Sequence, residues 1–233
     1  MGLIGRTAKR AGLLLLGLLL LFTAAWGVLA LYFFDQASPA LRTGLAAAYG
    51  LASLAALAGL ALPHWRWRAL AGYLALFALL LSQWFAIRPS NDRDWQPEVA
   101  ILPYATIEGE RVTVHNIRNF DYRSETDFTP AYYDKAFDLR QLDSVDLVAT
   151  YWMGPAVAHI FISFGFAGKD HLAISIEARK ERSEGYSTVK GFFRQYELYY
   201  VVADERDVIR VRTNYRKDPP EDVYVFRLKG ATD

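Results

Sequence analysis

The sequence predicts an α+β protein with three N-terminal transmembrane helices followed by a domain with a mostly antiparallel sheet. Two observations predict this arrangement: one part of the chain contains long uncharged stretches, and nearly all acids lie in the other part. Residues 1–88 hold seven Lys or Arg and one acid, whereas residues 89–233 hold 19 Lys or Arg and 24 acids. We therefore expect a membrane anchor at 1–88, a linker at 89–97 and a polar domain at 98–233.

Each of the three uncharged stretches is long enough to cross a bilayer as a helix. They cover about 11–34, 43–62 and 69–87, and about 20 apolar residues span a hydrocarbon core of roughly 30 Å. Short charged loops separate them, which is typical of membrane helices rather than of core helices. None contains Asp, Glu, Lys, Arg or His, so the ionisable groups of a transporter or channel pathway are missing and the spans predict an anchor.

The distribution of Lys and Arg predicts how the anchor is oriented. The first loop has only Arg42 beside Asp35, whereas the N-terminal end and the second loop hold Arg6, Lys9, Arg10, Arg66 and Arg68. Because cytoplasmic segments carry an excess of Lys and Arg, the N-terminus and the second loop are predicted to be cytoplasmic. Three crossings then place the polar domain on the opposite side of the membrane.

Two features of the spans have alternative interpretations. Small residues in the first span would suit signal-peptide cleavage: Thr23, Ala24 and Ala25. The apolar run exceeds an h-region of about 7–15 residues and two more spans follow, so we expect an uncleaved helix. In the second span, small side chains recur every four residues, at Gly44, Ala48, Ala52 and Ala56. Such a strip lets helices approach closely, which predicts packing within the three-helix bundle or, alternatively, homodimerisation.

The polar domain has the pattern of short strands joined by turns. A hairpin is predicted around Glu108–Glu110, and 187–196 resembles a short helix, while 207–212 fits either a helix or a strand. Further strands are predicted at 132–139, 145–151, 158–166, 171–178, 198–203 and 223–228. This mixture is typical of an α+β domain.

The composition excludes several classes of function. The absence of cysteine excludes disulfides, thiolate metal sites and a cysteine nucleophile within this chain. The polar part is acidic and has no Lys/Arg-rich run, which argues against nucleic-acid binding. No HExxH motif or His/Cys cluster predicts a metal site, and no motif predicts a cofactor.

Three histidines of the polar domain are candidate acid–base groups: His115, His159 and His171. If residues 167–170 form a tight four-residue turn, strand alternation places His159 and Ser163 on one face of the sheet. His171 then lies on the other face with Ser175 and Glu177. Ser163 is also roughly 13 Å from His159 along the strand, too far for direct activation.

His159 stands where a Gly-Pro segment turns into an apolar strand, a place typical of catalytic residues. From the residues alone, a hydrogen-bonded structural histidine is the favoured interpretation and a catalytic histidine is the alternative. The charged segment 177–186 is either a solvated loop or a source of supporting groups. In the second case Glu177 or Arg179 orients a catalytic group or binds a polar head group. The same two interpretations apply to the residues that follow the predicted helix: Arg194, Tyr196 and Glu197.

Several segments together resemble a known family. They are Pro-Ser-Asn-Asp-Arg-Asp-Trp at 89–95, His-Asn-Ile-Arg-Asn-Phe-Asp-Tyr-Arg at 115–123, Ala-His-Ile-Phe-Ile-Ser-Phe-Gly-Phe at 158–166, Ser-Ile-Glu-Ala-Arg-Lys at 175–180 and Gly-Phe-Phe-Arg-Gln-Tyr-Glu-Leu at 191–198. In this order, over about 89–228, they resemble the Lnb N-terminal periplasmic domain family, long catalogued as a domain of unknown function.

The resemblance implies a location, a reaction class and site residues. It implies a multi-pass protein of the bacterial inner membrane whose C-terminal domain is periplasmic and has part of a papain-like fold. Related proteins N-acylate lipoproteins through a Cys/His thiol mechanism, so phospholipid or lipoprotein is the expected partner. His159 matches the family histidine, with Glu177 and Arg179 as supporting groups.

The sequence departs from the family at the nucleophile. The family cysteine lies in an Asn-Cys-Thr segment downstream of the strand that corresponds to 223–228, and this sequence contains no cysteine. We therefore expect either a fragment of a longer acyltransferase or a member that binds without turnover. The alternative function is a non-catalytic protein- or lipid-binding module of the cell envelope. Apart from the small-residue strip, the sequence predicts no oligomeric state.

Overall fold

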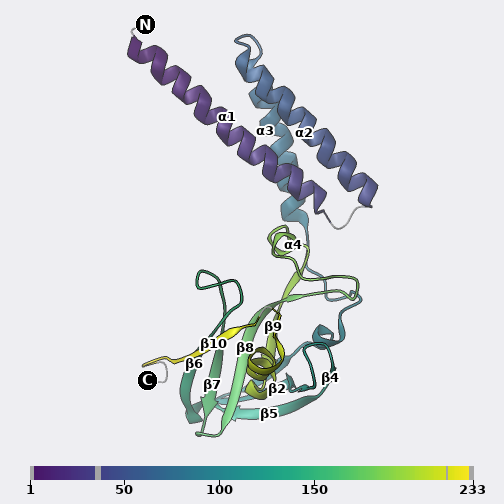
Figure 1. The fold of residues 1–233 in the computed structure, drawn as a ribbon, viewed down its shortest axis with the longest axis vertical. Coiled ribbons are helices and arrows are strands. Elements are labelled where there is room, and N and C mark those ends of the chain that lie inside the picture. The colour runs from purple at the N-terminus through teal and green to yellow at the C-terminus, as the bar shows by residue number, and fades with distance from the viewer. Residues whose placement is uncertain (1–2, 35–37, 219, 231–233) are drawn as a thin grey trace. The chain divides into compact units, whose positions relative to one another are not determined.

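The computed structural model describes residues 3–34, 38–218 and 220–230 (Figure 1). Asp35, which was used in predicting the orientation, lies outside them. The chain forms two compact units. One unit, here called the anchor unit, comprises Met1–Asn91 together with Tyr186–Gln195. The other, the domain unit, comprises Asp92–Gly185 and Tyr196–Asp233.

The anchor unit contains three long apolar helices, each long enough to cross a membrane. They are α1 (Leu3–Tyr32), α2 (Pro39–Ala61) and α3 (Arg66–Ala86). Proline begins α2, where its missing N–H costs nothing, and the Ser38 hydroxyl accepts a hydrogen bond from the Leu41 N–H at 3.4 Å. The fixed φ and the cap explain why α2 starts here.

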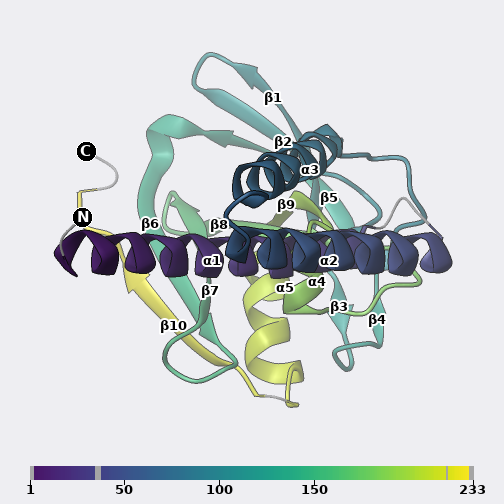
Figure 2. The same ribbon diagram turned by 90° about the horizontal axis from the view of Figure 1, so that it is seen from above.

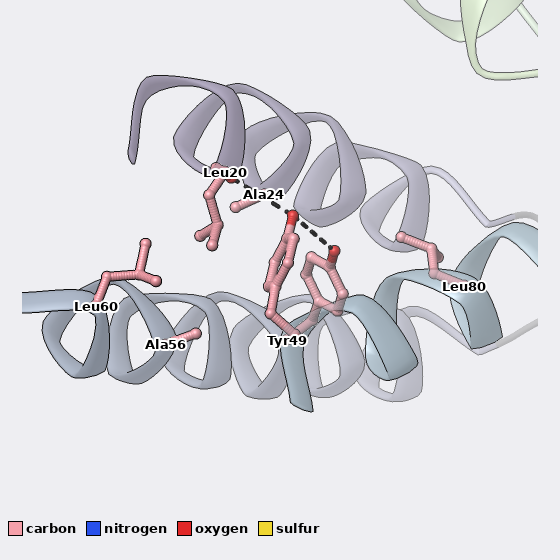
Figure 3. Close-up of a cluster of buried hydrophobic side chains, with 7 residues drawn as sticks. Leu20, Ala24, Tyr49, Ala56, Leu60 and Leu80 are labelled. Carbon is pink, nitrogen blue, oxygen red and sulfur yellow. Dashed lines mark hydrogen bonds between the residues drawn. The ribbon is translucent and has the colours of Figure 1, made fainter. Parts of the chain in front are cut away.

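A cluster of apolar side chains and hydroxyl groups joins the three helices (Figure 3). The Tyr73 hydroxyl lies 2.7 Å from the Thr23 hydroxyl and donates a hydrogen bond to the Leu20 carbonyl oxygen at 3.4 Å. Tyr49 donates to the Tyr73 hydroxyl at 3.5 Å. These bonds satisfy polar groups that would otherwise be costly inside an apolar bundle.

The prediction that the small-residue strip of α2 packs within the bundle is wrong for three of its four members. Gly44, Ala48 and Ala52 are exposed, and only Ala56 is buried. The buried face of α2 consists of Ala46, Tyr49, Ser53, Ala56 and Leu60. The helix is turned so that Tyr49 faces the bundle and its hydroxyl reaches the Tyr73 hydroxyl of α3, and this leaves most of the small-residue strip on the exposed side.

The domain unit contains an eight-stranded sheet, and this confirms the predicted α+β class. Seven strands follow the order β1-β2-β9-β8-β7-β6-β10, and β5 pairs with β2. Every pairing is antiparallel except the short β2–β9 contact. The strands are β1 (Tyr104–Glu108), β2 (Arg111–Arg118), β5 (Tyr132–Asp138), β6 (Leu142–Tyr151), β7 (Ala158–Phe166), β8 (Asp170–Arg179), β9 (Glu197–Ala203) and β10 (Asp222–Arg227).

Helical segments and a small second sheet complete the fold. The small sheet pairs β3 (Asp121–Tyr122) with β4 (Phe128–Thr129). The short 3₁₀ turn η1 (Pro97–Val99) precedes β1, and η2 (Leu139–Gln141) lies between β5 and β6. The helix predicted at 187–196 is shorter, α4 (Thr188–Phe192). The undecided segment 207–212 is helical: α5 (Glu205–Arg210) continues into the π-helical turn η3 (Val211–Tyr215).

One cluster of buried side chains in the domain unit lies between α5 (helix labelled in Figure 2) and one face of the sheet. Val208 of α5 is 1% exposed and packs on Val148, Phe161, Ala173, Val201 and Ala203. Since these residues come from β6, β7, β8 and β9, the helix covers the face that the four central strands present. The candidate histidine side chain lies on this covered face.

Candidate functional site

The turn between β7 and β8 determines which residues meet His159. Phe166 pairs with Asp170, so the turn has three residues, and two of them, Ala167 and Gly168, have φ of 52° and 67°. The predicted four-residue turn is therefore wrong. A change of one residue in register moves every side chain of a strand to the other face.

The register corrects the predicted faces of the two histidines. Gly165 pairs with His171, and both therefore lie on the face that also carries His159. Continued past the last pair, Ile162 with Ile174, this register brings His159 opposite Glu177. The two histidines stay apart because six residues along a strand span roughly 20 Å.

Ser175 and Glu177 of β8 hold the His159 ring. The His159 Nε2 lies 2.7 Å from Ser175 Oγ and 3.3 Å from Glu177 Oε1. The Ser175 hydroxyl in turn donates to Glu177 Oε1 at 2.9 Å. Ser175 is 2% exposed, whereas the His159 side chain keeps 22% of its surface. The ring is therefore fixed on its buried side and open on the other.

These contacts determine which ring nitrogen is available for chemistry. An ionised carboxylate can only accept hydrogen bonds, so the single Ser175 hydrogen goes to Glu177. The Ser175 oxygen must then accept from an N–H at Nε2 of His159. Nδ1 has no hydrogen-bond partner among the described residues and, in the neutral ring, carries the lone pair.

Arg212 of η3 supplies the charge that balances Glu177. Its Nη2 donates to Glu177 Oε1 at 2.6 Å, and its Nη1 donates to the Val208 carbonyl oxygen at 2.8 Å. The guanidinium lies 5.3 Å from the centre of the Phe161 ring, and the Arg212 side chain is 3% exposed. The α5–η3 segment thus brings a cation to the carboxylate beside His159.

Of the two predicted supporting groups, Glu177 lies beside His159, whereas the described contacts of Arg179 lie elsewhere. Arg179 donates to the carbonyl oxygens of Val99 and Ala100, both at 2.9 Å, and its guanidinium lies 4.0 Å from the Trp95 ring centre. These contacts hold the segment 95–100 against β8, and none of them reaches His159. We assign Arg179 a structural role on this geometry.

The other candidate groups lie in separate places. Ser163 donates to Glu205 Oε1 at 2.6 Å, and His171 Nδ1 lies 3.6 Å from the same oxygen. His115 Nδ1 lies 2.7 Å from an Asp134 carboxylate oxygen, and its ring stacks on Tyr104. Over the part of the chain that the structure describes, no group of three His, Asp or Glu could hold a metal ion.

Sequence reasoning missed Arg212 and the contact of Ser175 with His159. Arg212 lay in the segment that fitted either a helix or a strand, and only the helical reading places it one turn beyond Val208. For Ser175 a signal did exist, because alternation puts it on the same face as Glu177. The wrong turn length assigned both residues to the other histidine.

The pKa of Glu177 predicts a stability that depends on pH. Burial raises this pKa, but Arg212, His159 and Ser175 together outweigh burial and hold it well below its usual value of 4.5. At acidic pH the unfolded chain therefore binds a proton at Glu177 that the folded chain does not. The contribution of ionised Glu177 to the free energy of unfolding is thus present above about pH 5 and is lost on acidification.

We expect the free energy of unfolding of the full chain to fall as the pH drops below about 5, and Glu177→Gln to remove this component. At neutral pH the variant should lose about 1–3 kcal/mol of unfolding free energy, because the charged hydrogen bond between Arg212 and Glu177 is lost. Denaturant unfolding in detergent at several pH values measures both quantities. Identical pH profiles for the variant and the parent would contradict this account of the site.

The comparisons with known proteins agree with the resemblance seen in the sequence. Residues 128–233 match the family model of the Lnb N-terminal periplasmic domain. This range includes every residue of the His159 site, but not the segments 89–95 and 115–123. No curated protein and no solved structure matches the chain. With its three candidate spans, the chain is a multi-pass membrane protein whose residues 128–233 match the family model of the Lnb N-terminal periplasmic domain.

Proposed function

We propose that this domain acts in acyl transfer on phospholipids or lipoproteins, with His159 as the acid–base group. The observation that carries the proposal is that Ser175 and Glu177 hold the ring at Nε2, while Nδ1 has no hydrogen-bond partner among the described residues. A general base needs a fixed orientation and an unoccupied lone pair in reach of the reacting group. The membrane anchor supports this substrate class, because phospholipids, the candidate acyl donors, and lipoproteins all reside in the membrane.

In the proposed reaction, His159 Nδ1 takes the proton of a nucleophile as that group attacks the ester carbonyl carbon. The carbon–oxygen bond to the leaving alcohol then breaks, and the imidazolium returns the proton to that oxygen. Glu177 stabilises the imidazolium while it exists. A thiol nucleophile, which the family resemblance implies, would have to come from outside these 233 residues, because they include no cysteine.

The test compares His159→Gln with His171→Gln in membranes that carry the full chain, by following a labelled acyl group from phospholipid to a lipoprotein amine. Loss of a general base should lower transfer by about 10²–10⁴-fold. His171→Gln should leave it unchanged, because that ring lies in a separate cluster with Glu205. Equal transfer by the His159 variant and the parent, with both folded, would refute the proposed role.

A non-catalytic binding module is the second candidate, and one observation favours it. On the face of the sheet opposite His159, Ile176, Leu198 and Tyr200 are 55%, 75% and 61% exposed. Exposed apolar residues that cluster on a surface mark interaction sites. No detectable transfer by the parent chain, together with partner binding that His159→Gln leaves unchanged, would favour this function.

We also propose that the N-terminus and the α2–α3 loop face the cytoplasm, on the basis of the Lys and Arg distribution. Because the sequence has no cysteine, a single introduced cysteine reports its own side of the membrane. Glu110→Cys, in the β1–β2 turn, should react with an impermeant maleimide in intact spheroplasts. His64→Cys should react only after the membrane is opened, and the reverse pattern would contradict the orientation.

A further inference from the structure

The residues between β8 and β9 include a segment that packs with the membrane helices. This segment, residues 186–195, belongs to the anchor unit although the strands on either side of it belong to the domain unit. It contains the short helix α4, which lies at the ends of α1 and α3 (Figure 1). We refer to it as the interfacial segment.

Three consecutive residues attach the interfacial segment to those helix ends. Phe193 stacks on Phe33 with ring centres 5.3 Å apart and meets Trp84 edge-on at 6.3 Å. Arg194 donates to the Trp84 carbonyl oxygen at 3.1 Å, and its guanidinium lies 5.0 Å from that indole ring. Gln195 donates to the Phe33 carbonyl oxygen. These bonds satisfy carbonyl groups left open where α1 and α3 end.

The same segment exposes apolar side chains beside these contacts. Val189 and Phe192, three residues apart on α4, are 51% and 67% exposed, while Phe193 is 5% exposed. Phe85, at the end of α3, is 71% exposed. Exposed apolar side chains such as phenylalanine, on an element at the membrane surface, insert at the boundary between acyl chains and head groups.

Basic residues accompany the apolar ones. Lys190 is half-buried within α4 and Arg194 is exposed, while the interfacial segment has no acid. A short amphipathic element that combines apolar side chains with cations binds at a lipid surface, where the cations meet phosphate groups. Its attachment to the spans fixes its depth at the end of α3.

We propose that the interfacial segment lies in the outer lipid interface, with Val189 and Phe192 inserted among the acyl chains and Lys190 and Arg194 at the phosphates. The occupant of this surface is therefore the bilayer itself. The inference does not depend on acyl transfer. It gives the sheet a connection to the membrane through β8 and β9, in addition to the connection through 89–97.

The experiment uses the full chain with Thr188→Cys, an exposed position next to Val189, labelled with an environment-sensitive dye. The only cysteine is then the introduced one. The chain is placed in nanodiscs of phosphatidylethanolamine and phosphatidylglycerol. We expect blue-shifted emission, strong quenching by lipids with a nitroxide near the top of the acyl chain, and several-fold less quenching by aqueous iodide than for the dye–cysteine adduct in solution.

Two further variants separate insertion of α4 from the effect of the dye. Val189→Asp with Phe192→Asp should abolish quenching by the nitroxide lipids and restore quenching by iodide. Ile107→Asp, the same change at an exposed apolar residue of β1, should alter neither signal. Iodide quenching of the parent equal to that of the free adduct would overturn the proposal, as would lipid quenching that the double Asp variant leaves unchanged.

Discussion

The candidate site depends on one carboxylate oxygen, Oε1 of Glu177. It accepts hydrogen bonds from Arg212 and Ser175 and lies near the His159 ring. A carboxylate among buried side chains is stable only when a cation and donors replace the lost water. Arg212 meets this need and is fixed by the Val208 carbonyl oxygen. The orientation of the imidazole therefore depends on the pairing of Glu177 with Arg212. This pairing needs β7, which carries His159, β8, which carries Glu177, and η3, which carries Arg212.

The fold brings these three elements together in a simple way. The three-residue turn sets the register of β7 against β8, and α5 packs on the same face through Val208. Because α5 runs on into η3, the helix that covers the core also carries Arg212 to Glu177. The interfacial segment, which packs on the ends of α1 and α3, follows β8 in the chain, the strand that carries Ser175 and Glu177.

Much of this arrangement could be predicted from the sequence. A long apolar stretch is compatible with few structures other than a membrane helix, and alternation of apolar and polar residues with few other than a strand. The three spans, the β7–β8 hairpin and the family resemblance followed from such patterns. The contact of His159 with Ser175 could not, because it depends on one residue of turn length, which Ala167 permits by adopting a left-handed conformation. Arg179 and Glu177 looked equivalent in sequence, and only tertiary contacts separate the structural arginine from the glutamate of the site.

The central claim is that the site holds His159 with its proton on Nε2 and the lone pair on Nδ1. Nitrogen NMR of the full chain labelled at its imidazole rings tests this most directly, since only four histidines contribute and His159→Gln assigns the signal. At a pH where the ring is neutral, the account predicts a protonated Nε2 and a bare Nδ1, with this preference weakened in Ser175→Ala. A proton on Nδ1 in the parent chain would contradict it.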